Sequence, residues 1–203
     1  MGTWKIRKGY QQLIESWFSE FREKDNVQLL IKTDKPKQAE SYIKKIKKEM
    51  GINNNKGYAP ILFESKVFNE KELPRFIKSV DCLIAPHCGE GFCIPPLQCM
   101  ALKIPVIITN FSGCKDYAND KTATLLEPSG FILRKSMDGI PQFNSKKWAF
   151  IEVRKIQKAM RHVLNNQEQM HVKSNWAYLD VRNKFNYKVV SNLFINMIRE
   201  LYG

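Results

Sequence analysis

The sequence predicts an α/β fold in which a parallel sheet is covered by helices on both faces. Five short apolar runs have the length and composition of buried strands, and segments with helical spacing of apolar residues separate them. With 203 residues, 43% of them hydrophobic, the chain can form one domain with a substantial core. The predicted strands are 27–31, 60–63, 82–85, 105–109 and 123–126.

In the first half of the chain, helices are predicted between these strands. Residues 1–4 look like the tail of a further strand whose earlier part is missing. Helices follow after residue 9, at 35–50 and at 70–80, with a surface loop predicted at 53–57. The first of these helices presents an apolar face typical of a core helix: Tyr10, Leu13, Ile14, Trp17, Phe18 and Phe21.

The second half begins with alternation and ends in helices. A short helix is predicted near 115–118. The stretch 128–148 contains scattered Gly, Pro, Ser and Asn, which is typical of a long surface excursion. Helices are then predicted at 149–164 and 187–202, within a C-terminal helical region 149–203. The last helix carries an apolar stripe: Val189, Val190, Leu193, Phe194, Met197, Ile198 and Leu201.

The formal net charge of +13 is compatible with several interpretations. One is a lysine-rich solvated surface, and others are attraction to nucleotide diphosphates or to an anionic membrane leaflet. Because the lysines are dispersed and no recognised nucleic-acid-binding motif is present, we expect no nucleic-acid partner. Five cysteines without a paired framework indicate a reducing compartment. We therefore expect a cytoplasmic protein without a membrane span, with peripheral contact at the cytoplasmic membrane face as a further reading.

The stretch 86–100 is the strongest candidate for a functional site. It places Glu90 between two glycines, Gly89 and Gly91, directly after the predicted strand 82–85. A helix then begins, with Pro95 in its first turn. Open α/β sheets bind ligands at the carboxyl ends of their strands, and N–H groups at a helix start suit a phosphate. This pattern predicts a site for an anion beside a polyol.

This stretch resembles the donor-site signature of retaining glycosyltransferases of GT-B fold, family 4. That signature is a Glu in a Gly-rich loop followed, eight positions later, by a second Glu. Glu90 matches the first, and Gln98 stands at the second. The resemblance implies that Glu90 holds hydroxyls of the donor hexose and that Gln98 accepts a ribose hydroxyl without charge assistance. It also implies contacts to sugar and pyrophosphate from the loop residues Gly89, Gly91, Phe92, Cys93 and Ile94.

Residues 2–9 resemble the start of the C-terminal domain in the same family, where an Arg and a Lys five residues apart clamp the donor pyrophosphate. Lys8 matches the Lys, and Thr3 stands at the Arg position. Arg7 and Lys5 are neighbours that could compensate. The resemblance implies that Lys8 and Glu90 are the catalytic residues. It further implies that transfer needs neither a metal nor a cofactor besides the nucleotide sugar.

The resemblance covers most of the chain and implies a Rossmann-like domain spanning 1–203, which is one half of a GT-B fold. We expect the donor-binding half of an enzyme that transfers a hexose, with retention, from a UDP- or GDP-sugar to a glycan or lipid-linked acceptor. The N-terminal acceptor domain has no counterpart in the sequence. We therefore expect it in the same polypeptide or in another chain.

Other functions remain open at this stage. Gln98, Thr3 and the missing half also fit a nucleotide-binding or interaction module without transfer activity, and a GT-B sugar-nucleotide epimerase is a third reading. Glu90 could be a solvated loop acid, and Lys8 a surface lysine at a helix start. The neighbouring His87, Cys88, Cys93 and Cys99 match no usual zinc spacing, so no metal site is expected.

Overall fold

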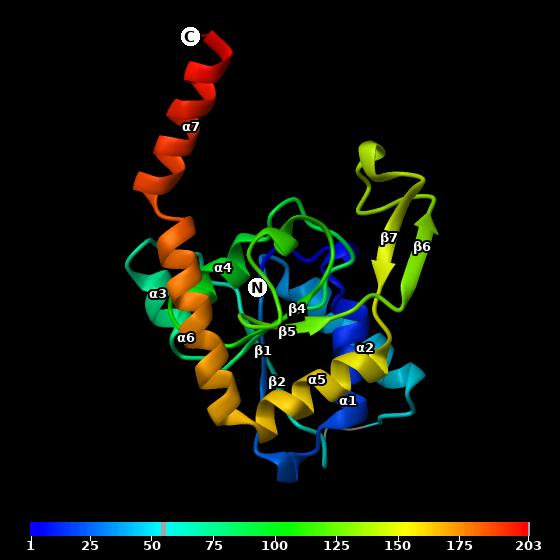
Figure 1. Ribbon diagram of the computed structural model, residues 1–203. Helices are drawn as coiled ribbons and strands as arrows, with labels where there is room; N and C mark the ends of the chain where they lie inside the picture. The colour runs from blue at the N-terminus through cyan, green and yellow to red at the C-terminus, as the bar shows by residue number, and fades with distance from the viewer. Residues whose placement is uncertain (54–55, 203) are drawn as a thin grey trace.

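The computed structural model describes residues 1–53 and 56–202 and has the predicted α/β fold (Figure 1). Residues 54 and 55, in the predicted 53–57 loop, lie outside the described residues. The α-helices are α1 Tyr10–Glu20, α2 Pro36–Glu49, α3 Glu72–Ile77, α4 Ile94–Met100, α5 Val153–Asn165, α6 Gln167–Lys184 and α7 Tyr187–Tyr202. Four 3-10 turns join them: η1 Ile6–Lys8, η2 Glu23–Asp25, η3 Ser112–Asp116 and η4 Pro141–Phe143.

The five predicted strands are all present, and they pair in parallel as predicted. They form two sheets in the described residues: β1 pairs with β2, and β4 lies between β3 and β5. A cavity of about 1630 Å³ is lined by residues of both β1 and β3. No pairing joins β1 or β2 to β3, β4 or β5 among the described residues, so the single sheet expected from sequence is divided into two. The strand bounds are β1 Leu29–Lys32, β2 Ile61–Glu64, β3 Leu83–Ala85, β4 Val106–Thr109 and β5 Thr124–Leu126.

The strand predicted at residues 1–4 is wrong for the described structure. In this segment the N–H of Gly2 donates to the carbonyl of Lys32, at 3.0 Å, at the end of β1. A single backbone bond at the end of a strand does not make a ladder. The segment instead leads into η1. Its C-cap Gly9 has a positive φ of 71° and is also the N-cap of α1.

Two apolar clusters hold the helices against the strands. In the first, the apolar face predicted for α1 is confirmed, because Ile14, Trp17 and Phe18 are buried against α5 residues such as Ile156. The second cluster joins α4, β4, η3 and α6. It contains Met100, Ile108, Cys114, Tyr117 and Ala177. Both clusters combine residues that are distant in sequence, so the core depends on contacts between separate segments of the chain.

The segment predicted as a surface excursion forms an antiparallel hairpin of β6 Gly130–Arg134 and β7 Lys146–Phe150. Its outer side chains are exposed, but Met137 and Trp148 are buried against Cys88 in a third, small cluster. The Gly, Pro, Ser and Asn residues of 128–148 therefore belong to a hairpin and its turns and not to an irregular surface loop. Because β7 continues to Phe150, α5 begins at Val153, later than predicted.

Helix α6 lies within the predicted C-terminal helical region 149–203, but its bounds were not predicted. Apolar residues lie on both of its sides, with Met170 and Ala177 buried while Val172 and Trp176 are exposed. A helix of this kind has no single apolar stripe, so periodicity does not reveal it. In the described chain, no helix combines the length and apolarity needed to cross a membrane.

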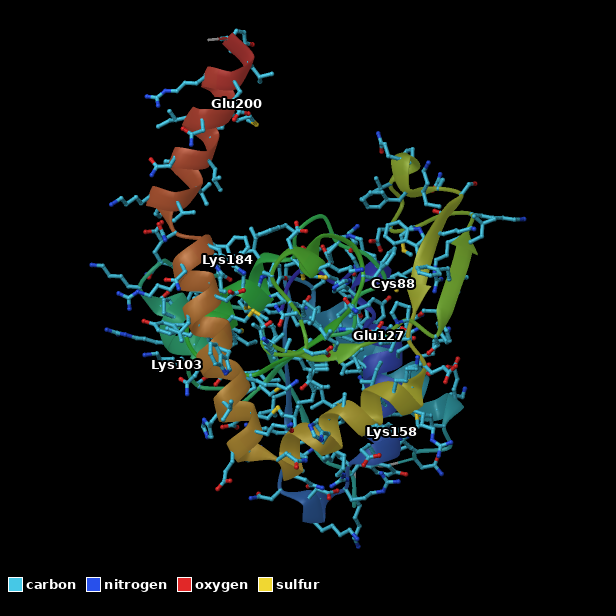
Figure 2. The ribbon with its side chains drawn as sticks, in the orientation of Figure 1. Cys88, Lys103, Glu127, Lys158, Lys184 and Glu200 are labelled. Carbon is cyan, nitrogen blue, oxygen red and sulfur yellow. The ribbon has the colours of Figure 1, made fainter. Side chains whose placement is uncertain are left out.

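Helix α7 is present as predicted, but its apolar stripe is not buried. No residue of α7 is buried, and Leu193 and Phe194 are 63% and 57% exposed. Figures 1 and 2 show α7, with Glu200 near its end, projecting from the body beyond Lys184 of α6. The helix therefore adds little to the core of this chain.

We expect removal of residues 187–203 to leave the remaining fold intact, because α7 buries no side chain. Thermal unfolding of a chain ending at Asn186 measures this. The Ile156→Ala variant is the matched core control, since its side chain is fully buried and its truncation should cost about 2–5 kcal/mol. A loss of stability on truncation as large as that of the control would contradict this account.

Candidate functional site

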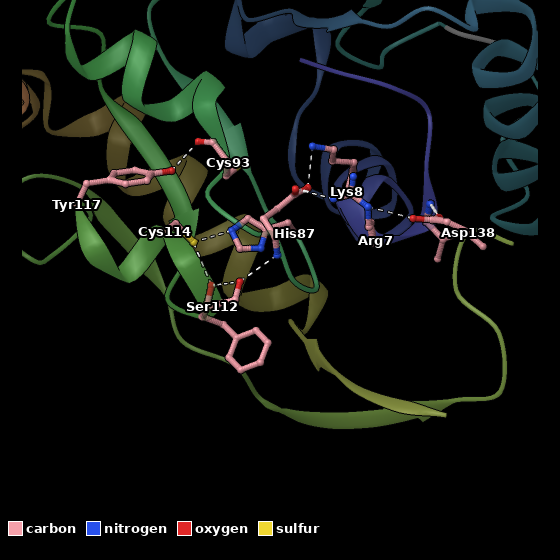
Figure 3. A network of polar contacts seen from close by, with 11 residues as sticks. Arg7, Lys8, His87, Cys93, Ser112, Cys114, Tyr117 and Asp138 are labelled. Atoms are coloured by element: carbon pink, nitrogen blue, oxygen red, sulfur yellow. Dashed lines mark hydrogen bonds and ion pairs between the residues drawn. The ribbon is translucent and has the colours of Figure 1, made fainter. Parts of the chain in front are cut away.

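The loop between β3 and α4 is held from three sides by segments that are distant in sequence. The N–H of Cys88 donates to the carbonyl of Arg7 at 2.8 Å, and the N–H of Ala149 donates to the carbonyl of Cys88 at 2.9 Å. On the third side, the N–H of Glu90 donates to Ser112 Oγ at 2.9 Å; the Ser112 side chain is labelled in Figure 3. The loop is thus anchored by η1, β7 and η3, and its conformation is fixed.

Two glycines permit the close approach of these segments. A Cβ on Gly9 would lie 1.8 Å from the carbonyl oxygen of Pro86, and a Cβ on Gly113 would lie 1.6 Å from that of Gly91. Both separations are far shorter than any real contact. Glycine at these positions therefore lets η1 and η3 pack directly on the loop backbone.

The anchored loop brings Glu90 together with Lys8 and Arg7. Glu90 Oε1 lies 2.7 Å from Lys8 Nζ, and Glu90 Oε2 lies 2.5 Å from Arg7 Nη1 (Figure 3). The Glu90 side chain is only 8% exposed, whereas Lys8 and Arg7 keep 25% and 23% of theirs exposed. Asp138, from the connection between β6 and β7, adds a second carboxylate 3.3 Å from Arg7 Nε. The four charges balance, as buried ionic groups require.

The remaining predicted site residues differ in where their side chains lie. Gly89 is buried, and a Cβ there would lie 3.1 Å from the Trp148 ring. The Phe92 ring packs against Tyr117 and Phe185, so its side chain belongs to the core. The carbonyl of Cys93 accepts a 2.7 Å hydrogen bond from the Tyr117 hydroxyl. Phe92 and Cys93 are thus held mainly by internal contacts.

Thr3, Ile94 and Gln98 are not part of the ion cluster formed by Lys8, Arg7, Glu90 and Asp138. Thr3 is exposed and uncharged, so position 3 supplies no cation to the site. Ile94 is 58% exposed at the first position of α4, and Gln98 is half-buried one turn later. Gly91 has open space around the position of a Cβ.

The first turn of α4 is a weaker phosphate site than its position suggests. Pro95 and Pro96 occupy its second and third positions, and neither has an N–H to donate. The remaining donor in this turn is the N–H of Ile94, preceded by that of Cys93, which has a positive φ of 61°. Side-chain cations must therefore supply more of any anion binding here.

His87 lies beneath the loop, a position that the sequence did not indicate. It is 1% exposed, and its Nε2 lies 3.0 Å from Cys114 Sγ. Burial lowers the pKa of His87 to about 4, so the imidazole is neutral near pH 7. Burial likewise raises the pKa of the Cys114 thiol, which is not poised as a nucleophile. In residues 1–53 and 56–202, no three His, Cys, Asp or Glu side chains are placed to hold a metal ion.

Sequence reasoning also missed Asp138 and Ser112. Asp138 lies 131 positions after Arg7 and about 50 positions after Glu90, so no local pattern connects them. The Asp138–Gly139 pair is a turn signal, and both residues have positive φ, but that signal does not show what the carboxylate contacts. Only the folding of the hairpin onto η1 places it.

We expect Gly113→Ala to destabilise the chain by roughly 1–3 kcal/mol, because the added methyl displaces the backbone of Gly91. Gly91→Ala is the matched control, since a Cβ there meets no atom within 4 Å. Chemical denaturation measures both variants. Equal stabilities would refute the proposed packing of η3 on the loop.

Because burial lowers the pKa of His87 from 6.5 to about 4, its neutral form favours folding above pH 6.5. We expect this contribution, roughly 3 kcal/mol, to be lost as the pH falls from 6.5 to 4. The test compares the unfolding free energy of the wild-type chain and His87→Gln at both pH values. A variant with the same pH dependence as the wild type would contradict the burial of a neutral His87.

Comparison with known proteins supplies the family. Residues 1–133 match the family model described as glycosyl transferases group 1. No curated protein matches the chain in sequence. Similar solved structures include the C-terminal domain of a glycosyl transferase group 1 family protein, LpcC, from Francisella tularensis. It has 17% identity and a TM-score of 0.67, with 92% of this chain and 84% of that chain covered.

Two further structures share the fold. One is the catalytic domain of cholesterol-α-glucosyltransferase from Helicobacter pylori, with 17% identity, a TM-score of 0.60 and coverage of 90% and 94%. The other is HepE of Anabaena in complex with UDP-glucose, with 11% identity and a TM-score of 0.67. There 98% of this chain aligns with 48% of HepE, so the chain spans about half of that protein. Since the family model covers residues 1–133 of 203, the chain belongs to the glycosyl transferases group 1 family.

Proposed function

We propose that the chain is the donor-binding domain of a retaining hexosyltransferase that uses a UDP- or GDP-sugar without a metal ion. The observation that carries this proposal is the Glu90 carboxylate held between Lys8 and Arg7 where the loop leaves β3. This is the edge at which open α/β sheets bind ligands. The structure of HepE with UDP-glucose supports a nucleotide sugar as the ligand class.

In this proposal Lys8 and Arg7 stabilise the leaving nucleotide diphosphate. Breaking the anomeric C–O bond places negative charge on that group, and fixed cations nearby lower the barrier. Both side chains are partly exposed, so a ligand can reach them. Glu90 is an acceptor for hexose hydroxyls, and its position beside the cations puts the sugar next to the diphosphate.

The ion pairs of Glu90 imply a competition that the sequence did not suggest. Glu90 contacts both cations, Lys8 and Arg7. A diphosphate has to share Lys8 and Arg7 with this carboxylate or displace it. Glu90 therefore opposes the binding of a bare nucleotide diphosphate and favours a donor whose hydroxyls satisfy the carboxylate. This makes Glu90 a selector for the sugar conjugate.

The complete reaction requires an acceptor site, which we assign to an N-terminal GT-B domain in the same polypeptide or in another chain. A glycan or lipid-linked acceptor is proposed from the family resemblance. A cytoplasmic location with peripheral contact at a membrane face is consistent with the net charge of +13. Donor binding is the part of the reaction that the present chain can carry.

A nucleotide-binding module without transfer activity is the second candidate. It is favoured by Thr3, which is exposed and uncharged where the family has an Arg, and by Gln98 in place of a Glu. Both candidates bind nucleotide. They differ in whether the chain, completed by an acceptor domain, transfers the hexose from the donor to an acceptor.

Calorimetric titration with UDP, GDP and ADP, and with their hexose conjugates, tests donor binding. We expect Lys8→Ala to weaken nucleotide and conjugate alike, by roughly tenfold, because a charge-assisted contact is lost. We expect Glu90→Gln to bind the free nucleotide at least as tightly as the wild type, while losing its preference for the conjugate.

Two variants control for charge alone. Lys48→Ala removes an exposed lysine of α2, and Glu168→Gln neutralises an exposed carboxylate of α6. Neither should change affinity appreciably. If folded wild-type chain binds no nucleotide, or if Lys48→Ala weakens binding as much as Lys8→Ala, the proposed donor site is wrong.

A further inference from the structure

Asp138 is a buried carboxylate of the ion cluster to which the proposed reaction assigns no role. Its side chain is 1% exposed. One oxygen accepts the N–H of Ile6 at 2.7 Å, and the other lies 3.3 Å from Arg7 Nε (Figure 3). This second pair is not aligned as a hydrogen bond, and both atoms are otherwise unpaired and buried. Asp138 therefore acts on Arg7 mainly through its charge and position.

The backbone at Asp138 is constrained to deliver this contact. Asp138 has a φ of 58° and the following Gly139 a φ of 71°, so the turn contains two consecutive residues in the left-handed region. Asp and Gly both tolerate this region and are typical of turns. The neighbouring Met137 is buried with Trp148 and Cys88, which anchors this turn against the body of the chain.

Arg7 is held at two of its three nitrogens. Nη1 lies against Glu90, and Nε faces Asp138. A guanidinium is a rigid planar fork, so fixing two nitrogens fixes the direction of the third. Because 23% of the side chain is exposed, a ligand beside Glu90 can reach the guanidinium.

We propose that Asp138 is a positioning residue for the donor diphosphate. Through Arg7 it fixes a second cation that works with Lys8, in place of the charge that Thr3 lacks. The inference rests on the proposed function and extends it, because it makes the β6–β7 hairpin part of the donor site. A merely structural Asp138 would hold the N–H of Ile6 and have no specific relation to Arg7.

A double-mutant cycle in UDP affinity separates these roles. The variants are Arg7→Met, Asp138→Asn and the double variant; Asn at 138 keeps an acceptor for the N–H of Ile6 while removing the charge. We expect Arg7→Met to weaken UDP binding at least about tenfold in the wild-type background, but less than about threefold when residue 138 is Asn. This coupling is a readout that a structural role would not produce.

Asp34 provides the matched control. Its carboxylate accepts the N–H of Trp4, in the same N-terminal segment, and has no ion pair with Arg7. Asp34→Asn should therefore leave the effect of Arg7→Met unchanged. Additive effects of Arg7→Met and Asp138→Asn would overturn the inference, as would an Arg7→Met variant that binds UDP like the wild type.

The outcome also separates this inference from the proposed function. If the wild type binds UDP and Lys8→Ala weakens it, but Arg7 and Asp138 are uncoupled, only the positioning role fails. If the folded wild type binds neither UDP nor GDP, the proposed function fails and the positioning role fails with it. Should Asp138→Asn not fold, the ¹⁵N NMR signal of Arg7 Nε–H in the wild type decides. A shift on addition of UDP is expected, and an unchanged signal overturns the inference.

Discussion

The ionic contact of Glu90 with Lys8 and Arg7 is the interaction on which the arrangement of the site depends. It joins a segment that precedes α1 to a loop that follows β3, more than 80 positions later. A carboxylate that is 8% exposed would be costly without partners, so the loop and η1 stabilise each other's charges. The packing of Gly9 on Pro86 and of Gly113 on Gly91 then sets the backbone distances that this contact needs. The site is therefore a consequence of tertiary packing around a short motif.

Local pattern was sufficient for the parts of the fold that local physics determines. Apolar runs gave all five parallel strands, and helical spacing gave α1, α2 and α7, because burial on one face leaves a periodic trace. Glu90 and Lys8 were also accessible from sequence, through the glycine-flanked loop and the family resemblance. Their mutual contact was not, since neither segment carries information about the other. The same holds for His87 and Cys114, which meet beneath the loop.

Three features of the fold were not predicted correctly, namely the bounds of α6, the β6–β7 hairpin and the exposure of α7, and each has a physical reason. Helix α6 packs Met170 and Ala177 inward while Trp176 faces solvent, so it has no stripe to detect. The scattered turn residues of 128–148 predicted a surface loop and not the β6–β7 hairpin. The Trp148 ring of this hairpin packs close to Gly89. The apolar stripe of α7 predicted a helix correctly but could not show whether anything covers it. For the hairpin and for α7, burial depends on contacts between residues distant in sequence, and the local pattern of a single sequence does not show such contacts.

The central claim is that this edge of the sheet binds a nucleotide diphosphate through the cations that Glu90 holds. A crystal structure of the chain with UDP tests it most directly. We expect diphosphate oxygens within hydrogen-bond distance of Lys8 Nζ, with Glu90 displaced from at least one of its two cations. UDP bound elsewhere, with the contacts of Glu90 to Lys8 and Arg7 unchanged, would contradict it.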